Sequence, residues 1–97
     1  MSTLPHVGIM FQRLTTKAEE VRDMLEKKIR RYKLMDAHRE LIRGGAYRQA
    51  QLVLRLLRDG KVTLWLDDDS YAVEMLCEGL GCHIWYSRNG NSAVAHI

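Results

Sequence analysis

The sequence predicts an α+β fold, in which two N-terminal helices are followed by a strand, a helix and two further strands that form a C-terminal hairpin. Apolar residues recur every three or four positions before Gly60, and they alternate with polar residues from Lys61 to Leu66. Asn89-Gly90 then separates two short runs that also alternate. With 97 residues, the chain is expected to form one domain with a modest core.

Residues 1–14 are expected to form an N-terminal arm ahead of an α+β domain that covers residues 15–97. The arm contains Pro5, the single proline of the chain. In a loose arm the Leu4-Pro5 bond can populate both isomers, so Pro5 is a candidate docking residue for a cyclophilin-type prolyl isomerase. A mobile tail and an added strand are the alternatives for this segment.

A long first helix is expected to begin at Thr16, because Thr16 and Glu19 have the spacing of a capping box. Nothing breaks it before Gly44-Gly45. One side of this helix is apolar and consists of Ala18, Val21, Leu25, Tyr32, Met35 and Ile42. Lys28 and Arg39 occupy the two remaining positions of the same spacing. This heptad-like spacing also allows a paired or self-associating helix.

The second helix is expected from about Ala46 to Asp59 and ends at Gly60, as is typical of a glycine C-cap. Its expected inward residues are Ala50, Val53, Leu54 and Leu57. Its basic residues share another face, with Gln51 between them: Arg48, Arg55 and Arg58.

Three consecutive aspartates follow the strand at Lys61–Leu66 and precede a helix with Val73, Leu76 and Leu80 inward. Carboxylates at an N-cap and in a first turn accept hydrogen bonds from free amides, so capping accounts for one or two of Asp67, Asp68 and Asp69. A hard cation such as Mg²⁺ is the alternative, but the sequence has no second acidic cluster or phosphate-binding loop to complete such a site. No catalytic residue is predicted.

The Asn89-Gly90 pair predicts a type I′ turn and thereby the register of the hairpin. The predicted pairs are Tyr86 with Ala93, Trp85 with Val94, Ile84 with Ala95, and His83 with His96. One face then belongs to the core: Ile84, Tyr86, Ala93, Ala95 and Ile97. Trp85 and Val94, with Trp65, are on the other face, where either the first long helix covers them or they form a partner-binding patch.

The paired histidines are the best candidate metal ligands, because two imidazoles opposite each other in a hairpin could share a zinc ion with Cys82 or Cys77. The register places Cys82 on the opposite face from His83, which leaves the set without a third ligand. No metal or cofactor is therefore predicted. Two cysteines five residues apart are typical of reduced thiols in a cytoplasmic protein.

Charge is unevenly distributed along the chain. The segment from Lys27 to Lys61 has 11 basic and 3 acidic residues, a net charge of +8, whereas the remainder carries −5. Such a segment can attract nucleic acid, an anionic membrane or an acidic protein face. The residues predicted to bind a partner are Arg48, Arg55, Arg58, Lys27, Lys28, Arg30, Arg31 and Trp85. Direct nucleic-acid binding through segment 27–61 is the alternative.

No membrane segment is predicted, because no apolar run approaches transmembrane length. The start MSTLPHVGIMF lacks the basic residues and the long apolar run of a signal peptide. A cytoplasmic location is therefore expected.

From Gln49 to Val94 the order of helix, glycine, strand, Asp-Asp, helix, Gly-Cys-His and hairpin resembles the second half of the TusA-like sulfur carriers. That family's chemistry needs a Cys-Pro-x-Pro motif, and the corresponding region from Gly44 to Arg48 has neither residue type. The resemblance implies a TusA-like fold without sulfur transfer.

In its size, basic character and lack of catalytic motifs, the whole chain resembles the small host-takeover proteins of lambda-like phages, among them the anti-RecBCD proteins of Salmonella phages. This resemblance implies a non-enzymatic protein of the host cytoplasm that binds the exonuclease-helicase RecBCD.

Overall fold

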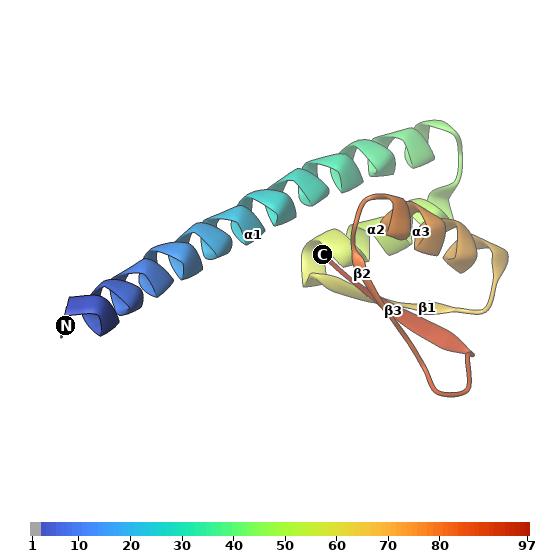
Figure 1. Ribbon diagram of the computed structural model, residues 1–97. Coiled ribbons are helices and arrows are strands. Elements are labelled where there is room, and N and C mark those ends of the chain that lie inside the picture. Colours follow the sequence, from blue (N-terminus) through green and yellow to red (C-terminus); the bar gives the residue numbers. More distant parts are fainter. Residues whose placement is uncertain (1–2) are drawn as a thin grey trace.

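The computed structural model has an α+β fold with the order α1-α2-β1-α3-β2-β3 (Figure 1). The helices are α1 (Thr3–Arg43), α2 (Tyr47–Asp59) and α3 (Asp68–Gly79). The strands are β1 (Lys61–Trp65), β2 (His83–Tyr86) and β3 (Ser92–His96). The structure describes the backbone from residue 3 onward and the side chains from residue 16 onward.

The first helix begins at Thr3, so the helix start predicted at Thr16 is wrong, as is the alternative of an added strand before it. Pro5 lies in the first turn of α1, where the missing amide N–H has no partner within the helix and where proline is tolerated. No other proline follows to end the helix. The Pro5 side chain is outside the described side chains, so isomerase docking stays a prediction.

The three strands form one antiparallel sheet in the order β1-β3-β2. All four predicted hairpin pairs are confirmed, from His83 opposite His96 to Tyr86 opposite Ala93. The predicted type I′ turn is wrong, because only Gly90 has a positive φ (70°) and its amide donates to the Ser87 carbonyl. The loop is therefore wider than two residues, and the register does not depend on the turn type.

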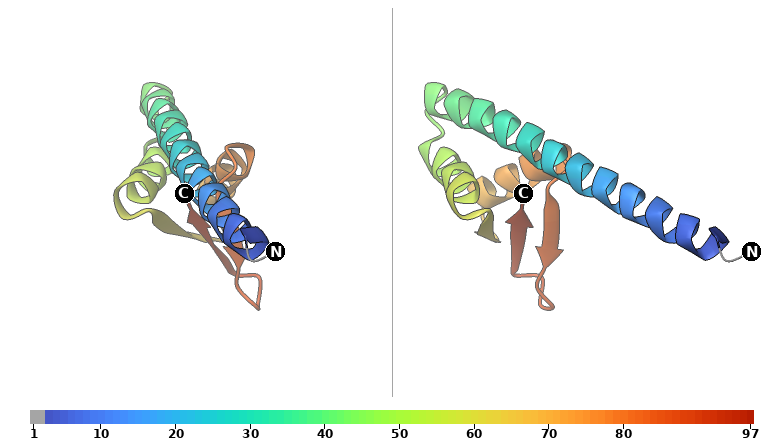
Figure 2. Two further views of the ribbon diagram at one scale, coloured as in Figure 1. Left: turned by 60° about the vertical axis from the view of Figure 1, so that its left-hand side comes forward. Right: turned by 90° about the vertical axis from the view of Figure 1, so that its left-hand side faces the viewer.

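The helices lie on one side of the sheet in two layers, with α2 and α3 against the sheet and α1 across them (Figures 1 and 2). Alternate strand residues supply the sheet side of the core, including Val62, Leu64 and Ala95. The remaining core members are Leu34, Val53, Leu56, Val73, Cys77, Cys82 and Ile97.

Two predicted core positions are wrong. Leu54 is 48% exposed, whereas Leu56 is fully buried. The buried side of α2 therefore follows Ala50, Val53 and Leu56, and Leu54 points away from it. Tyr86 is 65% exposed at the end of β2, where its hydroxyl donates to the Glu74 carboxylate at 2.6 Å.

Among the side chains that the structure describes, those of the C-terminal half of α1 make its contacts with the rest of the molecule. Leu34 is fully buried and Leu41 packs against the core, whereas the described part of the N-terminal half extends into solvent (Figure 2). The predicted apolar side of α1 is not the side that is buried, because Val21, Leu25 and Tyr32 are at least half exposed. The molecule is consequently elongated, with extents of 66 × 33 × 20 Å.

Candidate binding site

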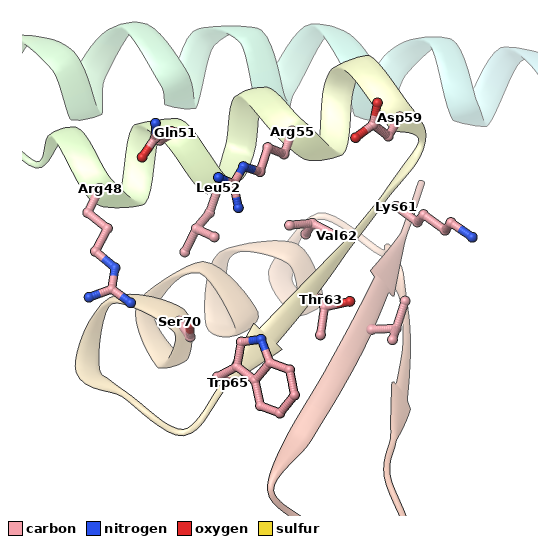
Figure 3. Close-up of a pocket in the computed structure, with 11 residues that line it drawn as sticks. Arg48, Gln51, Leu52, Arg55, Asp59, Lys61, Val62, Thr63, Trp65 and Ser70 are labelled. Carbon is pink, nitrogen blue, oxygen red and sulfur yellow. The ribbon is translucent and has the colours of Figure 1, made fainter.

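A groove of about 640 Å³ lies between α2 and the edge strand β1. Arg48, Leu52 and Arg55 line it from α2, and Val62 and Trp65 line it from β1 (Figure 3). The remaining lining residues are Gln51, Asp59, Lys61, Thr63, Ser70 and Val94. Among the described strands, β1 pairs with β3 alone, so its other edge directs backbone N–H and C=O groups toward the groove side.

The charged side chains of the lining are three cations, Arg48, Arg55 and Lys61, and one carboxylate, Asp59. Neither Arg55 nor Lys61 has a carboxylate oxygen within 4 Å among the described residues, and both are exposed. Asp59, the acidic residue of the lining, pairs with Arg58 at 3.1 Å. The hydrogen bond from Arg58 is the main cause that holds the pKa of Asp59 below its usual value, and Arg55 and Lys61 contribute further.

Arg48 is partly neutralised by the aspartates that begin α3. Its guanidinium lies 3.1 Å from Asp67 Oδ2 and 3.9 Å from Asp69 Oδ2. The capping prediction is confirmed, since Asp67 is the N-cap, its side chain accepts from the Ser70 amide at 2.7 Å, and Asp68 and Asp69 occupy the first turn. The aspartates thus fix the N-terminal end of α3. They also orient Arg48 at one end of the groove.

The sheet face opposite the helices is uncovered. The expectation that the first long helix covers Trp85 is wrong, because α1 lies on the other side of the sheet; Trp85 is 68% and Trp65 63% exposed. The strand register places Thr63, Val94 and Trp85 in one row of this face and Lys61, His96 and His83 in the next. The rings of Trp85 and His96 are arranged edge to face, with centroids 6.5 Å apart.

The predicted partner-binding residues do not form one site. Arg48 and Arg55 meet in the groove, Arg58 is held by its neighbour Asp59, and Trp85 lies on the outer sheet face. The four predicted residues of α1 are spread around that helix: Lys27 and Lys28 are exposed, Arg31 donates to the Leu57 carbonyl at 2.9 Å, and Arg30 is half-buried.

Lys61 and Trp65 line the groove but were not among the residues predicted to bind a partner; Trp65 was considered only for a patch on the sheet and Lys61 only as part of the basic segment 27–61. Sequence signals for them existed, since alternation places both on the same side of β1, opposite the core residues Val62 and Leu64. Their position beside α2 follows from β1 being an edge strand, and strand order is not encoded in a local pattern.

A second polar cluster lies inside the body, where Cys77 and Cys82 interact and the charge of Arg30 acts on Cys82. Both thiols are buried and reduced. The hydrogen bond from Cys77, assisted by the charge of Arg30, lowers the pKa of Cys82 to about 7, while the same bond and burial raise the pKa of Cys77. The Arg30 Nε is buried without a hydrogen-bond partner.

Among the described residues, no group of three or more His, Cys, Asp or Glu side chains is placed to hold a metal ion. Nor does the described part of the chain contain a helix with the length and apolar character needed to cross a bilayer. Comparison with family models, curated proteins and solved structures gave no match.

Proposed function

We propose that the protein is a non-enzymatic binding protein that holds an extended acidic segment of a partner protein in the groove between α2 and β1. The observation that carries the proposal is the presence of Arg55 and Lys61 beside the open edge of β1, two cations that form no ion pair with any described residue. An extended segment adds to such an edge through main-chain hydrogen bonds, and its carboxylates pair with the two cations.

The apolar residues of the lining can hold one apolar side chain of the bound segment. Trp65 presents an exposed indole at the rim, and the half-buried Leu52 lines the groove from α2 (Figure 3). A large apolar side chain of the bound segment would contact both, and tryptophan is over-represented among the residues that dominate interface energies. A segment in which acidic and large apolar residues alternate matches the groove best, because side chains alternate across a strand.

We infer that the partner belongs to DNA-processing machinery, with RecBCD as the specific candidate. The inference rests on the size, the basic character and the resemblance to phage host-takeover proteins described above. Binding would act by steric and electrostatic modulation of the partner.

Peptide binding tests the groove directly. A fluorescent peptide of alternating Glu and Val should bind more tightly than a Gln-Val peptide, and the difference should shrink as salt is added. Replacing both free cations (Arg55→Glu with Lys61→Glu) should weaken binding by about tenfold or more, because repulsion replaces attraction. The matched control reverses two exposed cations outside the groove, Lys17→Glu with Arg88→Glu, and should leave affinity nearly unchanged. Equal losses in the two variants would exclude the groove as the site.

The partner itself is tested with purified RecBCD. The wild-type protein should co-elute with it in size-exclusion chromatography, and the Arg55/Lys61 variant should not. Separate elution of the wild-type protein would remove RecBCD as the partner while leaving the peptide result intact.

Binding of single-stranded nucleic acid is a second candidate function, supported by the two exposed tryptophans on the helix-free sheet face. Trp65 and Trp85 offer flat surfaces for base stacking, and Lys61 on the same face, with the basic segment 27–61, offers charges for phosphates. Quenching of tryptophan fluorescence by single-stranded DNA at low salt tests it. Trp85→Ala should weaken DNA binding without changing peptide binding, since Trp85 is not part of the groove.

A further inference from the structure

The projecting half of α1 carries its apolar residues on the side turned away from the body. Leu25 precedes the fully buried Leu34 by nine residues, which is two and a half helical turns, so the two side chains point in opposite directions. Val21, Leu25, Ile29 and Tyr32 are 50%, 56%, 53% and 67% exposed. With Ala18, they form a continuous row along the outer side of the helix, which we call the outer row.

The body-facing side of the same segment is polar. Glu20, Asp23 and Lys27 continue the line of Leu34 and Leu41 toward the N-terminus, and all three are exposed. A helix that only projects into water has no physical need for apolar residues, least of all on the side that cannot reach its own core. The outer row therefore indicates contact with another molecule.

We propose that the occupant is α1 of a second copy of this chain, packed antiparallel with Leu25 facing Leu25. The outer row has spacings of three, four, four and three residues, so it reads the same in both directions about Leu25. Antiparallel packing consequently places Ala18 opposite Tyr32 and Val21 opposite Ile29 of the second copy. A two-fold axis at Leu25 makes one surface complementary to itself.

Charge complementarity specifies the antiparallel direction. Segment 19–26 carries a net charge of −3 and segment 27–33 a net charge of +5, and the sign changes between Glu26 and Lys27, next to the central leucine. Packed helices lie about 8–10 Å apart, within roughly one Debye length at physiological salt. Antiparallel packing places each acidic segment beside a basic one, whereas parallel packing places like charges together.

Individual side chains agree with this direction. Arg22 and Glu26 lie on the same flank of the outer row, and neither forms an ion pair with another side chain from residue 16 onward. In the antiparallel pair, Arg22 of one copy lies nearly level with Glu26 of the other, which gives two symmetric ion pairs. The bodies do not collide, because each lies on the far side of its own α1 (Figure 2).

Sedimentation velocity over a wide concentration range tests the pairing. The wild-type protein should show a monomer–dimer equilibrium, and Leu25→Glu should weaken the dimer by at least about tenfold, since each dimer contains two copies of the buried leucine. The control is Leu54→Glu, the same substitution at an exposed leucine of α2, which should leave the equilibrium unchanged. Circular dichroism establishes that both variants are folded. A wild-type protein that stays monomeric at every concentration overturns the proposal, as does equal weakening by both variants.

Disulfide cross-linking tests the direction of the helices. A mixture of Val21→Cys and Ile29→Cys chains should form the mixed cross-link, whereas each variant alone should cross-link poorly because its cysteines lie about eight residues of helix rise apart in the antiparallel pair. The wild-type chain is the control for the buried native thiols. Efficient cross-linking of Val21→Cys with itself would show parallel packing and overturn the antiparallel arrangement. None of these residues lines the groove, so this test is independent of the proposed function.

Discussion

At the scale of single residues, the aspartate cluster has a structural role that the sequence already indicated. Asp67 caps α3 through the Ser70 amide and also pairs with Arg48, so one carboxylate links the start of a helix to one end of the groove. The hydrogen bond from Ser70 is the main cause that keeps the pKa of Asp67 below its ordinary value of 3.8, with a smaller contribution from Arg48.

Asp67→Ala should therefore lower the melting temperature at neutral pH, because α3 loses its N-cap. In the wild-type protein this stabilisation is complete above pH 3.8 and is lost as the pH falls through the lowered pKa, since the carboxylate must then be protonated. The gap between wild type and variant should close in the same range. Thermal unfolding followed by circular dichroism measures both effects, with Asp68→Ala, which lacks a capping bond, as control. A gap that persists in strong acid would contradict this account.

The buried cysteine pair gives a second prediction at this scale. Ultraviolet titration of thiolate formation should show one thiol ionising near pH 7 and the other only above its usual range. Cys77→Ala should return the pKa of Cys82 toward its ordinary value of 9, because the hydrogen bond from Cys77 is the largest cause of the shift. Arg30→Met should move it in the same direction by less. An unchanged titration in both variants would show that neither group perturbs Cys82.

At the scale of elements, α1 consists of a docked half and a projecting half. Leu34 is its fully buried contact with the core, and Arg31 adds a hydrogen bond to the C-terminal end of α2. A positively charged residue near the last carbonyls of a helix also complements the helix dipole. Docking of α1 thus depends on a short stretch of a long helix.

Leu34→Ala should destabilise the protein by about 2–5 kcal/mol, as expected for a leucine truncated in a packed core. Leu54→Ala is the matched control at an exposed site and should cost only roughly 0.5 kcal/mol. Urea unfolding at low protein concentration measures the difference without a contribution from self-association. Similar losses in both variants would show that α1 is not anchored at Leu34.

Local patterns predicted most of the elements, because each is encoded by neighbours in the sequence. Alternation located β1, the glycine after Asp59 located the end of α2, and the hairpin register was confirmed at every pair. The start of α1 was predicted wrongly because the sequence pattern of a capping box, here Thr16 and Glu19, can also occur inside a helix. Which side of α1 is buried could not be read from its pattern, since the more regular apolar row is the one exposed to solvent.

The candidate site was only partly predictable. Arg48 and Arg55 were identified from their shared face on α2, but Lys61 and Trp65 come from a strand whose edge position depends on the order of the whole sheet. Arg58 was predicted on the same grounds as Arg55, and only the structure shows that Asp59 holds it. Net charge along a sequence does not reveal which cations already have partners.

At the scale of the whole molecule, the fold is more extended than a compact domain of the same number of residues. The radius of gyration is 18.6 Å, whereas a compact chain of this size has a value of about 13 Å. Small-angle X-ray scattering extrapolated to infinite dilution should give a value near the larger one. A result near that of a compact chain would show that α1 folds back on the body in solution.

The one-sided attachment of the body to α1 has a consequence for binding strength. A two-fold pair of such molecules would present two identical grooves on a common rod, held at a fixed separation. A partner assembly that displays two acidic segments at a matching distance would engage both, and the second contact would form at high effective concentration. Avidity of this kind would let two individually weak grooves retain a large complex. Disrupting the pairing of the two α1 helices would abolish it.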